Sequence, residues 1–70
     1  MPHRWVPRVS VRADQVDRLV TAYEAVGQAQ VGPSFHALNR ALITKDAIVG
    51  NSTNDELTEA SVELTKRAFT

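Results

Sequence analysis

Histidine, serine and paired carboxylates are the side chains in this sequence that could do catalytic chemistry. His3 and His36 are far apart, and neither has a second metal ligand three or four residues away. Asp14 and Asp17 fall at a predicted helix start, where capping and the helix dipole explain both. The serines lack a neighbouring base and the Gly-x-Ser-x-Gly turn of an activated nucleophile. They are Ser10, Ser34, Ser52 and Ser61. We therefore expect no catalytic residue, metal, cofactor or small-molecule substrate, and no enzymatic activity.

The composition predicts one small domain without covalent supports. The chain has 70 residues and no cysteine, so it has neither disulfides nor thiolate metal sites. A chain of this length buries only about 60% of the surface that its unfolded form exposes. We expect a second chain to supply the missing stability. No apolar run reaches the ~20 residues of a membrane span and no signal peptide is recognisable, so we expect a cytoplasmic location and no membrane partner.

Charge is balanced overall and unevenly distributed. Eight basic and eight acidic residues give a net charge of zero, which counts against nucleic-acid binding along the whole chain. Residues 1–12 contain arginines and no acid, whereas residues 46–70 contain five acidic and two basic residues. Any nucleic-acid contact is therefore expected at the N-terminal end.

The first twelve residues predict an extended arm followed by one strand. Pro2 and Pro7 favour an irregular arm over residues 1–7. In this arm Trp5 is expected to pack against the domain or a second chain, and stacking on a base or ligand is the alternative. The next five residues alternate, with Val9 and Val11 on the face opposite Arg8, Ser10 and Arg12. Because no second convincing strand is visible, we expect another molecule to pair with this one.

Two amphipathic helices are predicted next. The first runs near residues 14–26, with Asp14 as N-cap and Gly27 just past its end. Its apolar stripe is Val16, Leu19, Val20, Tyr23 and Val26. A loop follows over residues 28–33. Ser34 then caps a second helix that ends at Gly50-Asn51 through a residue in left-handed conformation. Its apolar residues include Phe35, Leu38, Ala41 and Leu42.

A third helix is predicted from the spacing of Thr53 and Glu56, the reciprocal pair of a capping box. Its apolar stripe is thin and consists of Leu57, Ala60, Leu64 and Ala68, while Val62 and Phe69 lie off it. The predicted fold class is mainly α, a short N-terminal strand followed by two or three helices. We divide the chain into an arm at 1–7, a strand-helix-helix core at 8–50 and an acidic helix at 51–70, which is either core or a partner-binding tail.

The strand Arg8-Val9-Ser10-Val11-Arg12, the helix at 14–26 and the Ser34-led helix with Phe35-His36-Ala37-Leu38 resemble a ribbon-helix-helix repressor over residues 7–48. This resemblance implies a homodimer that inserts a two-stranded ribbon into the major groove of double-stranded DNA. It would place Arg8, Ser10 and Arg12 on base edges and the amides of Gly32 and Ser34 on a phosphate. The implied dimer core is Val9, Val11, Val16, Leu19, Val20, Tyr23, Phe35, Leu38 and Leu42.

The resemblance implies a sequence-specific transcriptional regulator. Antitoxins that resemble this chain use an acidic tail to bind a toxin, so residues 51–70 would contact a protein partner. The contact residues expected for that partner are Trp5, Leu57, Leu64 and Phe69.

Two other interpretations remain open. A helical protein-interaction module without DNA binding explains the same apolar stripes, for example a phage or mobile-element inhibitor of a host complex or an assembly subunit, and the zero net charge favours it. Residues 15–25 also look like the first helix of resolvase-type helix-turn-helix domains, although no recognition helix follows.

Overall fold

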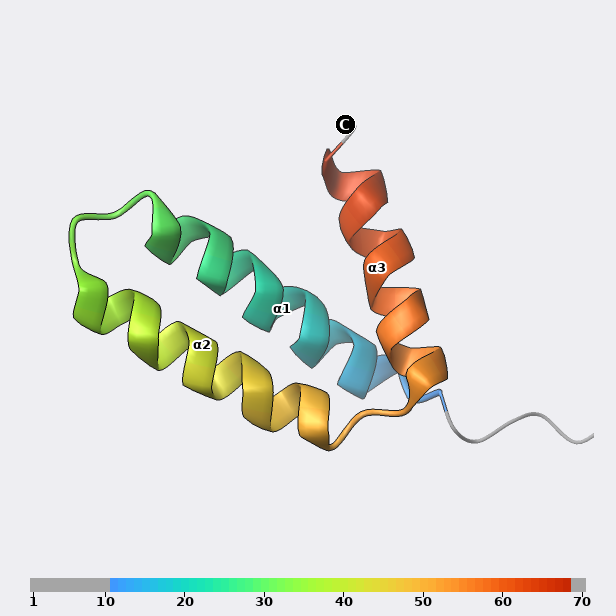
Figure 1. Cartoon of the computed structure of the whole chain (residues 1–70). Coiled ribbons are helices and arrows are strands. Elements are labelled where there is room, and N and C mark those ends of the chain that lie inside the picture. Colours follow the sequence, from blue (N-terminus) through green and yellow to red (C-terminus); the bar gives the residue numbers. More distant parts are fainter. Residues whose placement is uncertain (1–10, 69–70) are drawn as a thin grey trace, which may run out of the picture.

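The computed structural model describes residues 11–68, which form three α-helices joined by two short turns (Figure 1). The helices are α1 at Ala13–Gln30, α2 at Phe35–Gly50 and α3 at Asn54–Ala68. α1 and α2 form an antiparallel hairpin, and α3 crosses α1 near its N-terminal end. α1 is therefore the central element, because both other helices pack against it.

The predicted N-terminal strand and paired ribbon are wrong. Arg12 has extended backbone, with φ −113° and ψ 130°, but it is the N-cap of α1, and its amide donates to Oε2 of Glu56 at 2.9 Å. Residues 11–68 contain no strand, and Arg8, Val9 and Ser10 lie outside the described residues. A five-residue alternation fits an extended lead into a helix as well as it fits a strand, and here the partner of the backbone is a side chain of α3.

α1 is longer than predicted at both ends. It starts at Ala13 without a side-chain cap, so Asp14 lies in the first turn and is not the N-cap. Gly27 lies within the helix and does not end it, and Gln28, Ala29 and Gln30 are helical where a loop was predicted. No described residue has a positive φ, so the left-handed conformation that would require a glycine at this point is absent from residues 11–68.

The starts of α2 and α3 are as predicted. Ser34 Oγ accepts a hydrogen bond from the Ala37 amide at 3.2 Å. At α3 the capping box is confirmed in both directions, since the Glu56 amide donates to Thr53 Oγ1 at 3.1 Å and the Thr53 amide donates to Glu56 Oε1 at 2.9 Å. α2 ends at Gly50 as expected, but Asn51 has φ −104°, so the predicted left-handed termination is wrong.

The core lies where the three helices meet. Leu19, Val20 and Ala60 are almost completely buried and form its centre. The side chains that pack around them are Val16, Ile48, Val49, Leu57 and Leu64. α3 thus contributes directly to the core, and its far end is held by Arg67, whose guanidinium donates to both carboxylate oxygens of Glu24 on α1 at 3.1 Å.

None of the three helices within residues 11–68 combines the length and the apolar character that crossing a lipid bilayer requires.

Candidate functional site

The side chains considered for catalysis are not brought together. Asp14, Asp17 and His36 are exposed on the helices, Ser34 caps α2 and Ser61 is exposed on α3. His3 and Ser10 lie outside the described residues. Within residues 11–68 no three His, Cys, Asp or Glu side chains are grouped so that they could hold a metal ion.

Two polar side chains are buried, and both hold the helices together. Gln15 is 3% exposed and donates from Nε2 to Ser52 Oγ at 2.8 Å and to the Ile48 carbonyl at 3.4 Å. Ser52 Oγ in turn donates to the same carbonyl at 2.7 Å. Glu56, also 3% exposed, accepts the Thr53 and Arg12 amides. In the described part of the chain no buried side-chain nitrogen or oxygen lacks a partner. We name this cluster of Gln15, Ser52 and Glu56 the polar junction.

The environment of Glu56 favours its charged form. The hydrogen bond from the Thr53 amide, followed by that from the Arg12 amide, lowers the pKa of Glu56 below its ordinary 4.5, although burial acts in the opposite direction. A carboxyl group with a lowered pKa is a poor general acid or base near neutral pH. The polar junction is therefore structural.

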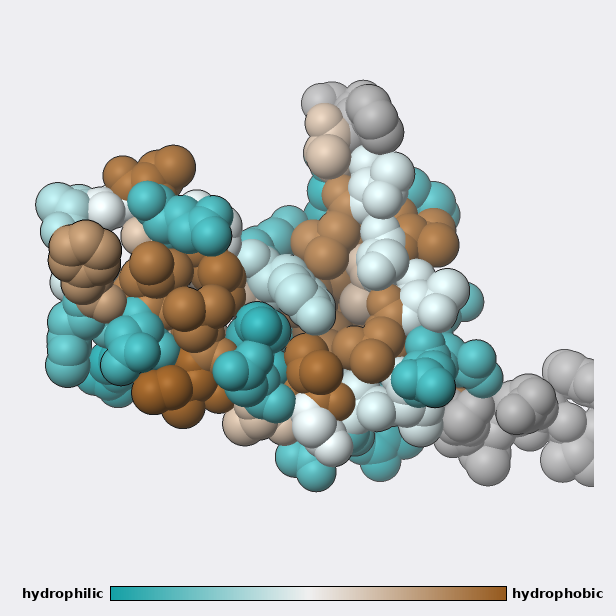
Figure 2. All heavy atoms as spheres, viewed as in Figure 1, coloured by the Kyte–Doolittle hydropathy of each residue, from teal (hydrophilic) through white to brown (hydrophobic). Residues whose placement is uncertain are grey.

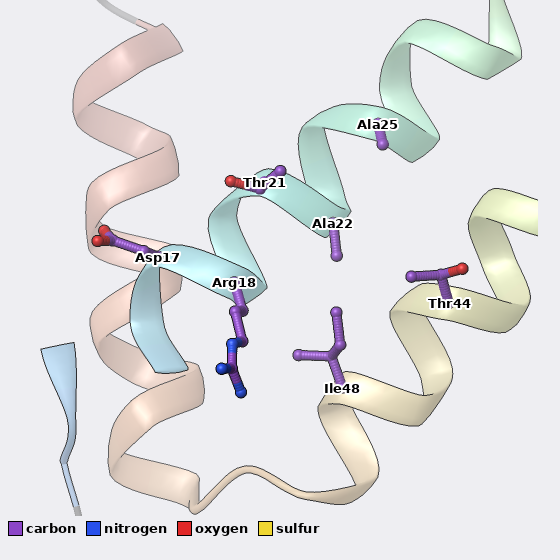
Figure 3. A pocket seen from close by; sticks show the side chains of 7 residues that line it. All are labelled: Asp17, Arg18, Thr21, Ala22, Ala25, Thr44 and Ile48. Atoms are coloured by element: carbon purple, nitrogen blue, oxygen red, sulfur yellow. The ribbon is translucent and has the colours of Figure 1, made fainter. Parts of the chain in front are cut away.

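A shallow groove runs between α1 and α2 on one flank of the hairpin (Figure 3). It has a volume of ≈ 330 Å³, and Thr44 and Ile48 of α2 face Ala22 of α1 across it. The Asp17 carboxylate points away from the groove, so it does not form an acid-base pair inside it. The remaining lining residues are Arg18, Thr21 and Ala25. This groove is a small-residue seam between two helices and has no catalytic arrangement.

α2 leaves large apolar side chains exposed, and none of its residues is buried. Phe35 is 87% exposed and Leu42 is 36% exposed, and Leu38 between them is half-buried. Tyr23 of α1 is also 36% exposed. In Figure 2 hydrophobic residues gather over the α1–α2 hairpin toward its turn, and separately over α3. We name the set of Tyr23, Phe35, Leu38 and Leu42 the hairpin face.

One cation borders the hairpin face. Lys45 Nζ lies 5.9 Å from the centre of the Tyr23 ring and 2.7 Å from Asp46 Oδ1. The hydrogen bond with Asp46 raises the pKa of Lys45. Lys45 therefore keeps its positive charge, which interacts with the Asp46 carboxylate and the Tyr23 ring.

The predicted dimer-core residues separate into three groups. Leu19 and Val20 are buried within the single chain, and Val16 packs against them. Val11 is 37% exposed, and Val9 lies outside the described residues. The four others make up the hairpin face, and their place in a dimer core stays a prediction.

The other predicted contacts are spread over the molecule. The Gly32 amide donates to the Ala29 carbonyl at 3.2 Å, and Ser34 Oγ is engaged in its cap, while phosphate binding by these residues stays a prediction. Leu57 and Leu64 pack against the core. Trp5 and Phe69 lie outside the described residues, so a partner contact through 51–70 also stays a prediction.

No protein-family model, no curated protein and no solved structure matches this chain.

Proposed function

We propose that this chain is a helical protein-interaction module and that the hairpin face is its binding surface. The supporting observation is that α2, a helix with three large apolar residues among its first eight, buries none of its residues within the chain. An apolar helix face that the chain covers only in part is typical of a surface that another protein covers.

The form of the hairpin face suits contact with a helix. Phe35, Leu38 and Leu42 are spaced by three and four residues, so they lie along one side of α2. A partner helix laid along that side would contact all of them at once, as in helix-in-groove recognition. The aromatic rings of Phe35 and Tyr23 would supply most of the buried area, as aromatic anchors do in protein interfaces.

The proposed function does not include DNA binding. The prediction of DNA binding depended on a paired ribbon, and Val11 and Arg12, the described residues of the predicted strand, are not in a strand. A cytoplasmic location stays a prediction alongside the proposed function.

Site-specific photo-crosslinking tests the proposal. A photoreactive phenylalanine analogue replaces either Leu42 in the hairpin face or Val62, which is 49% exposed on α3 and serves as the control. Both versions of the full chain are irradiated in an extract of cells that produce the protein. We expect a discrete adduct from position 42 that position 62 does not give.

The mass of the adduct identifies the partner as a second copy or as another protein. Equal labelling from both positions, or no adduct from position 42, would contradict the proposed function.

A further inference from the structure

α2 carries a continuous helix-packing seam that its own chain only partly covers. Phe35, Leu38, Leu42, Lys45 and Val49 follow one another at spacings of three, four, three and four residues. This alternation is the heptad spacing with which helices pack side by side in bundles. Phe35 and Leu42 are exposed and the other three are half-buried, so one side of the seam has room for another helix.

The other helices of the chain do not fill that side. α1 has a matching seam at Val16, Leu19, Tyr23 and Val26, and it covers α2 from one direction only. α3 packs mainly on α1, where Arg12 contacts Glu56 and Glu24 contacts Arg67, and it meets α2 at the Ile48 and Val49 end of that helix. The hairpin therefore resembles half of a four-helix bundle.

The ends of the seam are symmetric about Leu42, because Phe35 and Val49 are each seven residues from it. The inner positions are only approximately so, since Leu38 is four residues before it and Lys45 three after it. If two copies of α2 lie antiparallel with Leu42 beside Leu42, Phe35 of each copy lies beside Val49 of the other. The same helix face thus complements itself about a two-fold axis, as a closed dimer requires.

Charge and area are compatible with a second copy. The net charge of zero gives two chains no overall repulsion, and the one charged residue of the seam, Lys45, is already paired with Asp46. The exposed parts of Phe35, Tyr23 and Leu42 amount to roughly 300 Å² per chain. Because apolar atoms make up about 65% of homodimer interfaces, two copies would bury roughly 900 Å² in total, which is the size of a weak, reversible interface.

We propose that the partner of the hairpin face is a second copy of this chain, with the two α2 helices antiparallel about a two-fold axis at Leu42 and the two α1–α2 hairpins forming a four-helix bundle. This inference rests on the proposed function, since both use the hairpin face.

Single cysteines test the register, because the chain has none of its own. Leu42→Cys, Phe35→Cys, Val49→Cys and the control Val62→Cys are each treated with a short bifunctional thiol reagent. Packed helix axes are about 8–10 Å apart, so the Leu42→Cys pair is within reach. Two Phe35→Cys residues would be separated along the helices by about 20 Å. We expect Leu42→Cys to link to itself, Phe35→Cys and Val49→Cys to link only when mixed, and Val62→Cys to stay unlinked.

Three outcomes would overturn the inference. They are linking of Leu42→Cys no faster than that of Val62→Cys, self-linking of Phe35→Cys, and sedimentation of the unmodified wild-type chain as a monomer at every concentration. The last of these needs no variant, so loss of folding by a cysteine variant does not obscure the result. If the wild-type chain is a monomer and position 42 still forms a photo-adduct with a different protein, the inference fails and the proposed function stands.

Discussion

The two ends of the α1–α2 hairpin are built differently. At the end that holds the start of α1, α3 completes the packing around Leu19 and Val20. The polar junction lies at the same end, and every buried polar side-chain atom in the described part of the chain has a hydrogen-bond partner. Toward the turn only two helices meet, and Phe35 at the start of α2 and Leu42 at its middle remain exposed. The comparison indicates that buried packing is concentrated at one end and exposed apolar surface lies toward the other.

The strongest test of this comparison is a matched pair of leucine truncations. Leu19→Ala removes a side chain that is 0% exposed and should lower the free energy of unfolding by about 3 kcal/mol. Leu42→Ala removes a side chain that is already 36% exposed, so at concentrations where the chain is a monomer it should cost about 1 kcal/mol or less. Urea titration followed by circular dichroism measures both. Equal losses would show that the packing around Leu42 contributes as much to stability as the packing around Leu19.

The second test concerns the polar junction. Ser52→Ala removes the closer of the two hydrogen-bond acceptors of Gln15 Nε2 and leaves the contact with the Ile48 carbonyl at 3.4 Å. A buried donor left poorly satisfied costs about 1–2 kcal/mol in unfolding free energy. Ser61→Ala, on the exposed surface of α3, is the control and should change stability by roughly 0.5 kcal/mol or less. If the two variants are equally stable, the junction does not fasten the helices.

The smallest effect is on the pH dependence of stability. The pKa of Glu56 is lowered in the folded chain. The charged Glu56 side chain therefore stabilises the fold above pH 4.5, and this stabilisation is lost as the pH falls through the folded-state pKa. Glu56→Gln should therefore lose less stability than the wild type on acidification below 4.5. Glu59→Gln, exposed on the same helix, should retain the wild-type profile. Urea midpoints of the three proteins are measured at neutral and acidic pH. If the midpoint falls equally in the wild type and in Glu56→Gln, the lowered pKa of Glu56 is contradicted.

The features predicted correctly from the sequence are local ones. The Ser34 cap and the Thr53–Glu56 capping box depend on residues three positions apart, and the burial of Leu19 and Val20 follows from the spacing within one helix. The predicted strand, and the end of α1 at Gly27, were wrong because a short alternation and a single glycine each fit two local structures. The choice between them is made by contacts with distant residues, such as that of Arg12 with Glu56.

The candidate site shows the same division. The sequence marked Tyr23, Phe35, Leu38 and Leu42 as apolar residues of helices, and it predicted an interface for them through the wrong fold. It gave no signal for the hydrogen bond between Gln15 and Ser52, because those residues are far apart in the chain and meet only when the helices pack. Nor could it show that α3 would cover α1 and leave α2 exposed.

Sedimentation equilibrium of the wild-type chain, Leu42→Asp and Val62→Asp over a range of concentrations tests the central claim that another copy covers the hairpin face. A carboxylate at position 42 would be buried without a partner in the dimer, whereas one at position 62 stays in water. We predict that the wild type and Val62→Asp associate reversibly and that Leu42→Asp remains a folded monomer. A wild-type monomer at all concentrations, or equal association of the two variants, would contradict the claim.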